Sequence, residues 1–484
     1  MLANQTVEIL KSLSKEELKH LGDFIKSPYF NSSKPLEKVY EVIQKHYPEF
    51  SEKALSYEKV FKKLYPAEEY NEKRMKNLYA EFSSLLKKFL GYEKISSDKR
   101  DIDIYTIASL TQRNLNVISE RFIAKSLKDN DDGLLSISDN FNYLFSLDVS
   151  HSMNLSELRK HGSDEYVRTD TVFVEKVIIF SLVHILQHSF YDIMNQNVFN
   201  LQPNPVLKEV LDSFNVEKIL TYFDKKNHEY ASYLRVHYLF YYYSFNDISE
   251  KEYASFKKEI LKIIGKVKKT DQNQFLLRII HMIIAKLVSK NQKYYNDVIE
   301  FAEMFSTLKI YPDENFYVFN IGTFQDIFIV AISLRKFDWA EKFVNEYINY
   351  IGKEVHTELE NYCRGVLSYN RGKYEESLEY LGKVKLVGIT EKINIRFYYL
   401  MNYIELQSYE SAYSALLSFR QFISSSNEIP AMFVDGVNET LKFFAEIIRF
   451  KEKGDKPDEY IVKEANGDRT YFYRGYILNK FTSA

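Results

Sequence analysis

The sequence predicts an almost entirely α-helical protein built from stacked helical hairpins. Apolar residues recur at helical spacing along most of the 484 residues. The chain has only 15 Gly and 9 Pro, which disfavours an all-β fold with many tight turns. Three short segments in the C-terminal half are similar to one another: Lys336–Ala340, Lys373–Ser377 and Ser408–Ala412. Their aromatic residues are 37 and 35 positions apart, close to the period of about 34 residues of helix–turn–helix repeats.

Residues 1–95 are predicted to form a small N-terminal helical domain. Ser14 and Glu17 have the spacing of a capping box, in which each side chain accepts the other residue's free backbone N–H. Pro35 opens the second major helix, and a short third helix is expected over Tyr57–Leu64. The fourth helix carries the most regular apolar stripe: Met75, Leu78, Tyr79, Phe82, Leu85, Leu86, Phe89 and Leu90.

Beyond this domain, the polar residues 95–103 are interpreted as a linker or a kink. Residues 104–452 continue the helical pattern and are expected to form the repeat array, which ends at the polar stretch Lys453–Pro457. Residues 453–484, including a last aromatic stretch over Tyr471–Phe481, are expected to be a C-terminal capping segment.

The composition points to the cytoplasm. The single cysteine, Cys363, excludes an intramolecular disulfide, which fits a reducing compartment. We expect it to be a small core residue rather than an activated thiolate. Charged residues interrupt the first apolar stretch, so no signal peptide is expected, and the apolar stretch Phe316–Leu334 contains too many polar residues for a membrane span.

The three similar segments resemble tetratricopeptide repeats. In that family two antiparallel helices meet at a turn that often contains Gly, and an aromatic and then a small residue follow. Gly372 supplies the turn glycine in one repeat, whereas Arg335 and Gln407 occupy that position in the other two, which are therefore degenerate. The specific resemblance covers residues 294–422.

The resemblance implies a concave groove, lined by the first helix of each hairpin, that binds a protein or a peptide. The matching groove positions are Gln325, Tyr362, Asn370 and Phe397. Tyr362 and Phe397 would supply contact area, and Gln325 and Asn370 would orient a bound segment. The alternative is that these residues contact a neighbouring part of the same chain, such as the C-terminal segment.

The N-terminal region is also similar to the opening of a family of uncharacterised bacterial proteins, which are helical throughout and of comparable length. The resemblance rests on four stretches: Leu13–Glu17, Ser27–Asn31, Val60–Pro66 and Leu85–Glu93. It implies an all-helical architecture and assigns no activity.

Two patterns were considered as metal sites. His184 and His188 lie one helical turn apart, but Ile185 replaces the Glu that follows the first His in zinc proteases; His151 and His161 were weighed as further ligands. The loop Asp129–Gly133 resembles a calcium loop, but its Gly comes one position early and Asn140 replaces the closing Glu. We therefore expect neither metal nor cofactor.

The sequence lacks a phosphate-binding Gly-rich loop, a Gly-x-Ser-x-Gly turn and a Cys-x-x-Cys pair, so we expect a non-enzymatic scaffold that binds a protein or peptide. Nucleic-acid binding is the alternative. Tyr238–Phe245 offers rings for base stacking, and a lysine-rich stretch, Lys257–Lys269, follows it. The net charge of −2 gives no general drive towards nucleic acid. A cryptic enzyme is the third possibility.

Overall fold

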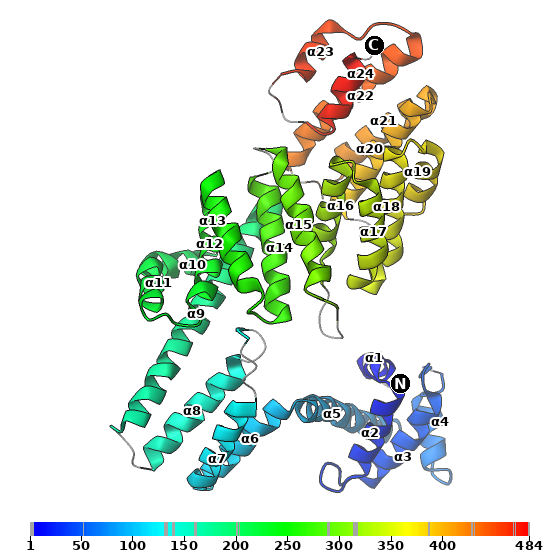
Figure 1. Cartoon of the computed structure of the whole chain (residues 1–484). Helices are drawn as coiled ribbons and strands as arrows, with labels where there is room; N and C mark the ends of the chain where they lie inside the picture. Colours follow the sequence, from blue (N-terminus) through cyan, green and yellow to red (C-terminus); the bar gives the residue numbers. More distant parts are fainter. Residues whose placement is uncertain are drawn as a thin grey trace. The chain divides into compact units, whose positions relative to one another are not determined.

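The computed structural model of the chain is all-α (Figure 1). It describes residues 4–51, 53–129, 134–137, 141–158, 162–199, 202, 204–287, 291–312, 318–385, 388–426, 429, 431–467, 469 and 471–482. These residues contain 24 α-helices and no strand, and an isolated parallel bridge joins Leu135 to Val267. None of the described helices has both the length and the apolar character needed to cross a lipid bilayer.

The chain divides into two compact units. The N-terminal unit contains residues 1–131 and 143–173, and the C-terminal unit contains residues 132–142 and 174–484. These divisions differ from the domain boundaries near residues 95 and 453 that are expected from the sequence. Two helices, α8 and α9, continue across the divisions at residues 142–143 and 173–174.

The helices from the N-terminus as far as α9 are α1 (Asn4–Ser12), α2 (Lys15–Lys26), α3 (Lys34–Ile43), α4 (Tyr57–Leu64), α5 (Glu72–Ser97), α6 (Lys99–Gln112), α7 (Asn116–Asp129), α8 (Phe141–Glu157) and α9 (Asp164–Phe199). Those that follow are α10 (Pro205–Ser213), α11 (Val216–Lys225), α12 (Ala231–Phe245), α13 (Glu250–Ile264), α14 (Lys269–Lys286), α15 (Tyr295–Thr307), α16 (Ile321–Ser333), α17 (Phe337–Tyr347), α18 (His356–Asn370), α19 (Tyr374–Leu381), α20 (Ile389–Glu405), α21 (Tyr409–Ser425), α22 (Ala431–Lys453), α23 (Glu459–Ala465) and α24 (Arg474–Thr482).

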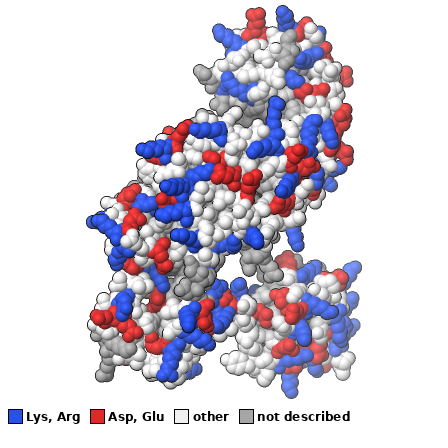
Figure 2. All heavy atoms as spheres, viewed as in Figure 1, with Lys and Arg blue, Asp and Glu red and all other residues white. Residues whose placement is uncertain are grey.

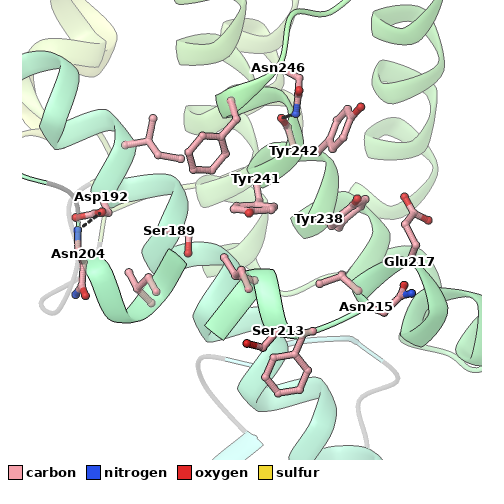
Figure 3. A pocket seen from close by; sticks show the side chains of 16 residues that line it. Ser189, Asp192, Asn204, Ser213, Asn215, Glu217, Tyr238, Tyr241, Tyr242 and Asn246 are labelled. Atoms are coloured by element: carbon pink, nitrogen blue, oxygen red, sulfur yellow. Dashed lines mark hydrogen bonds between the residues drawn. The ribbon is translucent and has the colours of Figure 1, made fainter. Parts of the chain in front are cut away.

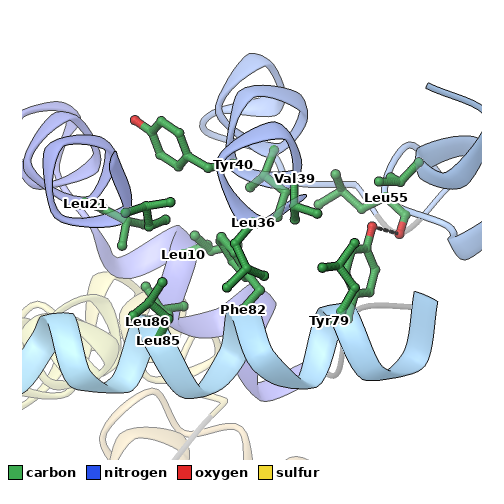
Figure 4. Close-up of a cluster of buried hydrophobic side chains, with 14 of the residues drawn as sticks. Leu10, Leu21, Leu36, Val39, Tyr40, Leu55, Tyr79, Phe82, Leu85 and Leu86 are labelled. Carbon is green, nitrogen blue, oxygen red and sulfur yellow. Dashed lines mark hydrogen bonds between the residues drawn. The ribbon is translucent and has the colours of Figure 1, made fainter. Parts of the chain in front are cut away.

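Helices α1 to α5 share one hydrophobic core in the N-terminal unit (Figure 4). The predicted capping box at Ser14 is confirmed, because Glu17 N–H donates to Ser14 Oγ at 3.1 Å and Ser14 N–H donates to Glu17 Oε2 at 2.7 Å. The apolar stripe of α5 points into this core. The hydroxyl of Tyr79 on α5 donates to the Leu55 carbonyl at 3.0 Å, so the long helix is also held by a buried hydrogen bond.

The polar stretch after the first five helices is a kink rather than an extended linker. Helix α5 ends at Ser97 and α6 begins at Lys99, with Asp98 alone between them. Asp98 caps α6, since its carboxylate accepts the Arg100 backbone N–H at 2.9 Å. Beyond the kink, α6 to α8 pack around a smaller apolar cluster that contains Ile107 and Ile123.

In the C-terminal unit, consecutive helices from α12 to α21 pack against one another in the order of the sequence (Figure 1). The turns of the three similar segments have the same conformation. Arg335, Gly372 and Gln407 all have positive φ, and the residue after each donates its N–H to a carbonyl five positions earlier at 2.8–2.9 Å. Arg335 and Gln407 therefore adopt a left-handed conformation that favours glycine.

The small residues of these segments occupy close helix contacts. Ala340, Ser377 and Ala412 have no solvent exposure. A Cβ atom at Gly365 would lie 2.6 Å from the Leu381 side chain, so glycine is needed for α18 and α19 to approach each other as they do. These observations agree with a register in which the aromatic residue begins the second helix and the small residue packs against the first.

The C-terminal unit also includes a short piece of chain from between α7 and α8. Leu135 N–H donates to the Lys266 carbonyl at 2.9 Å, and Lys268 N–H donates to the Leu135 carbonyl at 3.1 Å. These two bonds attach residues 134–137 to the turn between α13 and α14.

Candidate functional site

Two of the four predicted groove residues are buried. Tyr362 on α18 is 3% exposed, and Phe397 on α20 has no exposure. Burial raises the pKa of the Tyr362 hydroxyl well above its ordinary value. Neither ring is available to a partner in this structure.

The C-terminal segment covers Phe397. The rings of Phe472 and Tyr473 lie with their centroids 5.8 Å and 5.0 Å from the Phe397 ring. The Tyr473 hydroxyl donates to Asn394 Oδ1 at 3.4 Å, and the Lys480 ammonium lies 2.8 Å from a Glu405 carboxylate oxygen. The contact of this face with the chain's own C-terminal segment, the alternative raised from the sequence, is thus present at Phe397.

The two polar groove residues, Gln325 and Asn370, are half-buried. The Asn370 side-chain amide donates to the Val366 carbonyl at 2.8 Å, within its own helix. Gln325 lies on α16, beside Asp326. The aromatic stretch Tyr471–Phe481 is the sequence feature that could have indicated that Phe397 is covered. Its own residues do not indicate which helix it packs against.

A pocket of about 840 Å³ lies elsewhere in the C-terminal unit, between α9, α10, α11 and α12 (Figure 3). We call it the aromatic pocket. Four of its rings come from α12, where Tyr238, Tyr241, Tyr242 and Phe245 are spaced so that they share one helical face. Phe214, which follows α10, is 51% exposed, and Phe245 is 60% exposed.

The rings of the aromatic run Tyr238–Phe245 therefore lie in two different environments. Phe240 and Tyr243 are buried in the core, as expected for rings that pack between helices. The other face of α12 supplies the pocket. Sequence periodicity separates the two faces, but it does not say which face stays open.

The charged groups of the aromatic pocket are both acidic. Asp192 and Glu217 are among its lining residues, and no Lys or Arg is among those in the part of the chain that is described. Figure 3 places the two carboxylates at opposite ends of the pocket, so they do not converge on one point. Asp192 accepts the Asn204 backbone N–H at 3.0 Å, and burial with Glu217 nearby raises the pKa of Tyr238 to about 12.

The histidine pair forms no metal centre within the described residues, where no group of three or more His, Cys, Asp or Glu side chains could hold an ion. The rings of His184 and His188 are 6.4 Å apart. Burial, and secondarily His188, lowers the pKa of His184. His151, in the N-terminal unit, lies 2.5 Å from a Glu120 carboxylate oxygen. His161, Asn140 and residues 130–133 of the calcium-like loop lie outside the described residues.

Several lysines that followed the aromatic run are engaged within the fold. Lys257 lies 3.0 Å from Asp297 and 2.6 Å from Glu300. The Lys269 ammonium donates to the Leu308 carbonyl. On the face that Figure 2 shows, basic and acidic residues are intermingled, and no continuous basic stripe is visible.

Cys363 is fully buried on α18, and burial raises the pKa of its thiol, in agreement with a core residue. Comparison with known proteins finds no matching family model, no similar curated protein and no similar solved structure. The fold and the pocket thus define a class, an all-α protein of packed helix pairs with an open aromatic pocket, and function has to be argued from these features alone.

Proposed function

We propose that the protein is a non-enzymatic scaffold of tetratricopeptide-like hairpins, stacked as a solenoid, that binds an extended segment of a partner protein. The observation that carries the proposal is the aromatic pocket, where the rings of Phe214, Tyr242 and Phe245 remain exposed. Large aromatic rings that stay in water at a concave site are typical anchors of protein interfaces. The shared turn geometry at Arg335, Gly372 and Gln407 supports the repeat architecture.

The charge of the pocket favours a peptide over a nucleic acid. Asp192 and Glu217 would repel a phosphate backbone, and the described lining supplies no cation to attract one. A peptide with an apolar side chain between the rings and a basic residue near either end would match both the rings and the carboxylates.

In this proposal, the groove residues considered from the sequence have an internal role. Phe397 contacts the C-terminal segment directly and Tyr362 lies near Tyr473 of that segment, whereas Asn370 and Gln325 lie on α18 and α16. A partner would contact Phe397 only after displacing Phe472 and Tyr473.

Site-specific photocrosslinking tests the proposal. A photoreactive benzoyl-phenylalanine replaces Phe245 in the pocket or, as the matched control, Tyr413, which is 55% exposed and does not line the pocket. After irradiation in the native cell, we expect a protein to be crosslinked from position 245 and not from position 413. The crosslinked segment is then synthesised, and its affinity is measured for the wild type and for Tyr242→Ala with Phe245→Ala.

The double variant should bind the segment at least about 30-fold more weakly, because aromatic anchors commonly contribute 2 kcal/mol or more. Raising the salt from about 50 to 200 mM should change the affinity little, whereas a protein that neutralises 6–10 phosphates loses about 10³–10⁵. Crosslinking to nucleic acid, or equal affinity of wild type and double variant, would refute the proposal.

A further inference from the structure

A second pocket in the C-terminal unit has the opposite charge. It has a volume of about 540 Å³ and lies between α19, α20 and α21. Three cations line it, Lys385, Lys392 and Arg396, and no carboxylate is among its described lining residues. Lys392 and Arg396 are one turn apart on α20, so they share a face of that helix. We call it the basic pocket.

Two of these cations, Lys392 and Arg396, differ from several other cations of the C-terminal unit. Arg364, Arg371 and Arg449 each have a carboxylate oxygen within 3.0 Å. Within the described residues, Lys392 and Arg396 have no carboxylate within ion-pair distance.

Arg396 is also partly removed from water. It is half-buried, its guanidinium carbon lies 3.8 Å from the centre of the Phe422 ring, and Nη1 donates to the Lys392 carbonyl at 2.9 Å. Burial lowers the pKa of this guanidinium. A desolvated cation without a counter-charge costs free energy, and a bound anion would offset that cost.

We propose that the basic pocket binds a phosphate monoester carried on an organic group. Three cations suit the charge of about −1.5 to −2 of a phosphate monoester better than that of a single carboxylate. The Ser418 hydroxyl at the pocket can donate a further hydrogen bond. Leu381, Ile395 and Phe419 form an apolar wall for the organic group. This site is separate from the aromatic pocket and does not depend on the scaffold function.

The test is isothermal titration calorimetry of the full-length protein with phenyl phosphate at low ionic strength. We expect saturable binding, weakened about tenfold or more by Lys392→Gln and by Arg396→Gln, since hydrogen bonds to charged groups are the stronger ones. Lys373→Gln is the matched control, because Lys373 lies outside the pocket and pairs with Glu376 at 3.2 Å. Melting curves establish that each variant is folded, and if Arg396→Gln does not fold, Lys392→Gln decides.

Two further probes complete the experiment. Benzoate, which has the ring and a single negative charge, should bind at least tenfold more weakly than phenyl phosphate. A short phosphotyrosine peptide distinguishes the source of the phosphate: weaker binding than phenyl phosphate supports a free small molecule, and tighter binding supports a phosphorylated protein. The proposal would be overturned by an absence of phenyl phosphate binding at about 10 mM, by equal affinity of Lys392→Gln and wild type, or by benzoate binding as tightly as phenyl phosphate.

Discussion

Two sets of aromatic residues in the C-terminal unit have the same chemistry and opposite surroundings. Phe397 on α20 has no exposure: Phe472 and Tyr473 of the C-terminal segment pack against it, as do Phe419 on α21 and Phe444 on α22. Phe245 on α12 is 60% exposed and lines a pocket. The comparison indicates that similar aromatic faces become buried or stay exposed according to which other parts of the chain pack against them.

The largest expected effect comes from uncovering the first set. Phe472→Ala with Tyr473→Ala should lower the free energy of unfolding of the C-terminal unit by about 3–5 kcal/mol, since the substitution leaves a cavity against Phe397. Tyr242→Ala with Phe245→Ala should change it by less than about 1 kcal/mol, because those rings are at the surface. The measurement is urea unfolding followed by the fluorescence of Trp339, the single tryptophan of the chain, which lies in this unit. If the two double variants unfold at the same urea concentration, the proposed difference between covered and exposed rings is wrong.

A smaller loss of stability is expected when a small residue buried between helices is replaced by Trp. Ala340→Trp or Ala412→Trp should cost about 1–3 kcal/mol, because each position is fully buried between helices and overpacking forces them apart. Ser213→Trp is the control: Ser213 is exposed and lines the aromatic pocket, so the new ring should be tolerated. Thermal melts followed by circular dichroism compare the three. If Ala340→Trp and Ala412→Trp melt with the wild type, the register assigned to the repeats is wrong.

The smallest effect concerns a partly buried carboxyl group on α16, Asp326. Burial raises the pKa of Asp326 from 3.8 to about 6, so its charged form destabilises the folded state. Asp326→Asn should therefore stabilise the protein by about 1–2 kcal/mol at pH 8. The gain is present above the folded pKa and should diminish as the pH falls through about 6 towards 4, where the folded and unfolded states both bind the proton.

Urea unfolding at pH 8 and at pH 5 measures the effect at Asp326. Glu217→Gln, an exposed carboxyl of the aromatic pocket, should change stability by no more than about 0.5 kcal/mol at either pH. A gain from Asp326→Asn that is the same at both pH values would indicate that the effect does not arise from the charge.

Local features of the fold were predictable because their causes are local. The capping box at Ser14, the short helix over Tyr57–Leu64 and the burial of Ala340 each follow from residues within one helical turn or one short segment. The sequence offered the covering of Phe397 by the C-terminal segment only as an alternative. The contact depends on residues about 75 positions away, and their aromatic character does not specify where they pack.

The candidate sites show the same limit. Tyr238, Tyr241, Tyr242 and Phe245 have the spacing of one helical face, but the exposure of that face depends on how α9 to α11 pack around it. The isolation of Arg396 from carboxylates can be seen only once the helices are placed, because nothing in its sequence neighbourhood distinguishes it from the paired Arg364.

The attachment of residues 134–137 to the turn at residues 266–268 has a consequence for biosynthesis. A ribosome delivers Leu135 long before Val267, the residue that it faces in the parallel bridge. The N-terminal unit also needs residues 143–173 for its completion, so the nascent chain cannot finish one unit and then begin the next. Residues 134–137 therefore leave the ribosome before their partners at residues 266–268 exist, and a chain that stops between residues 137 and 266 would lack those partners.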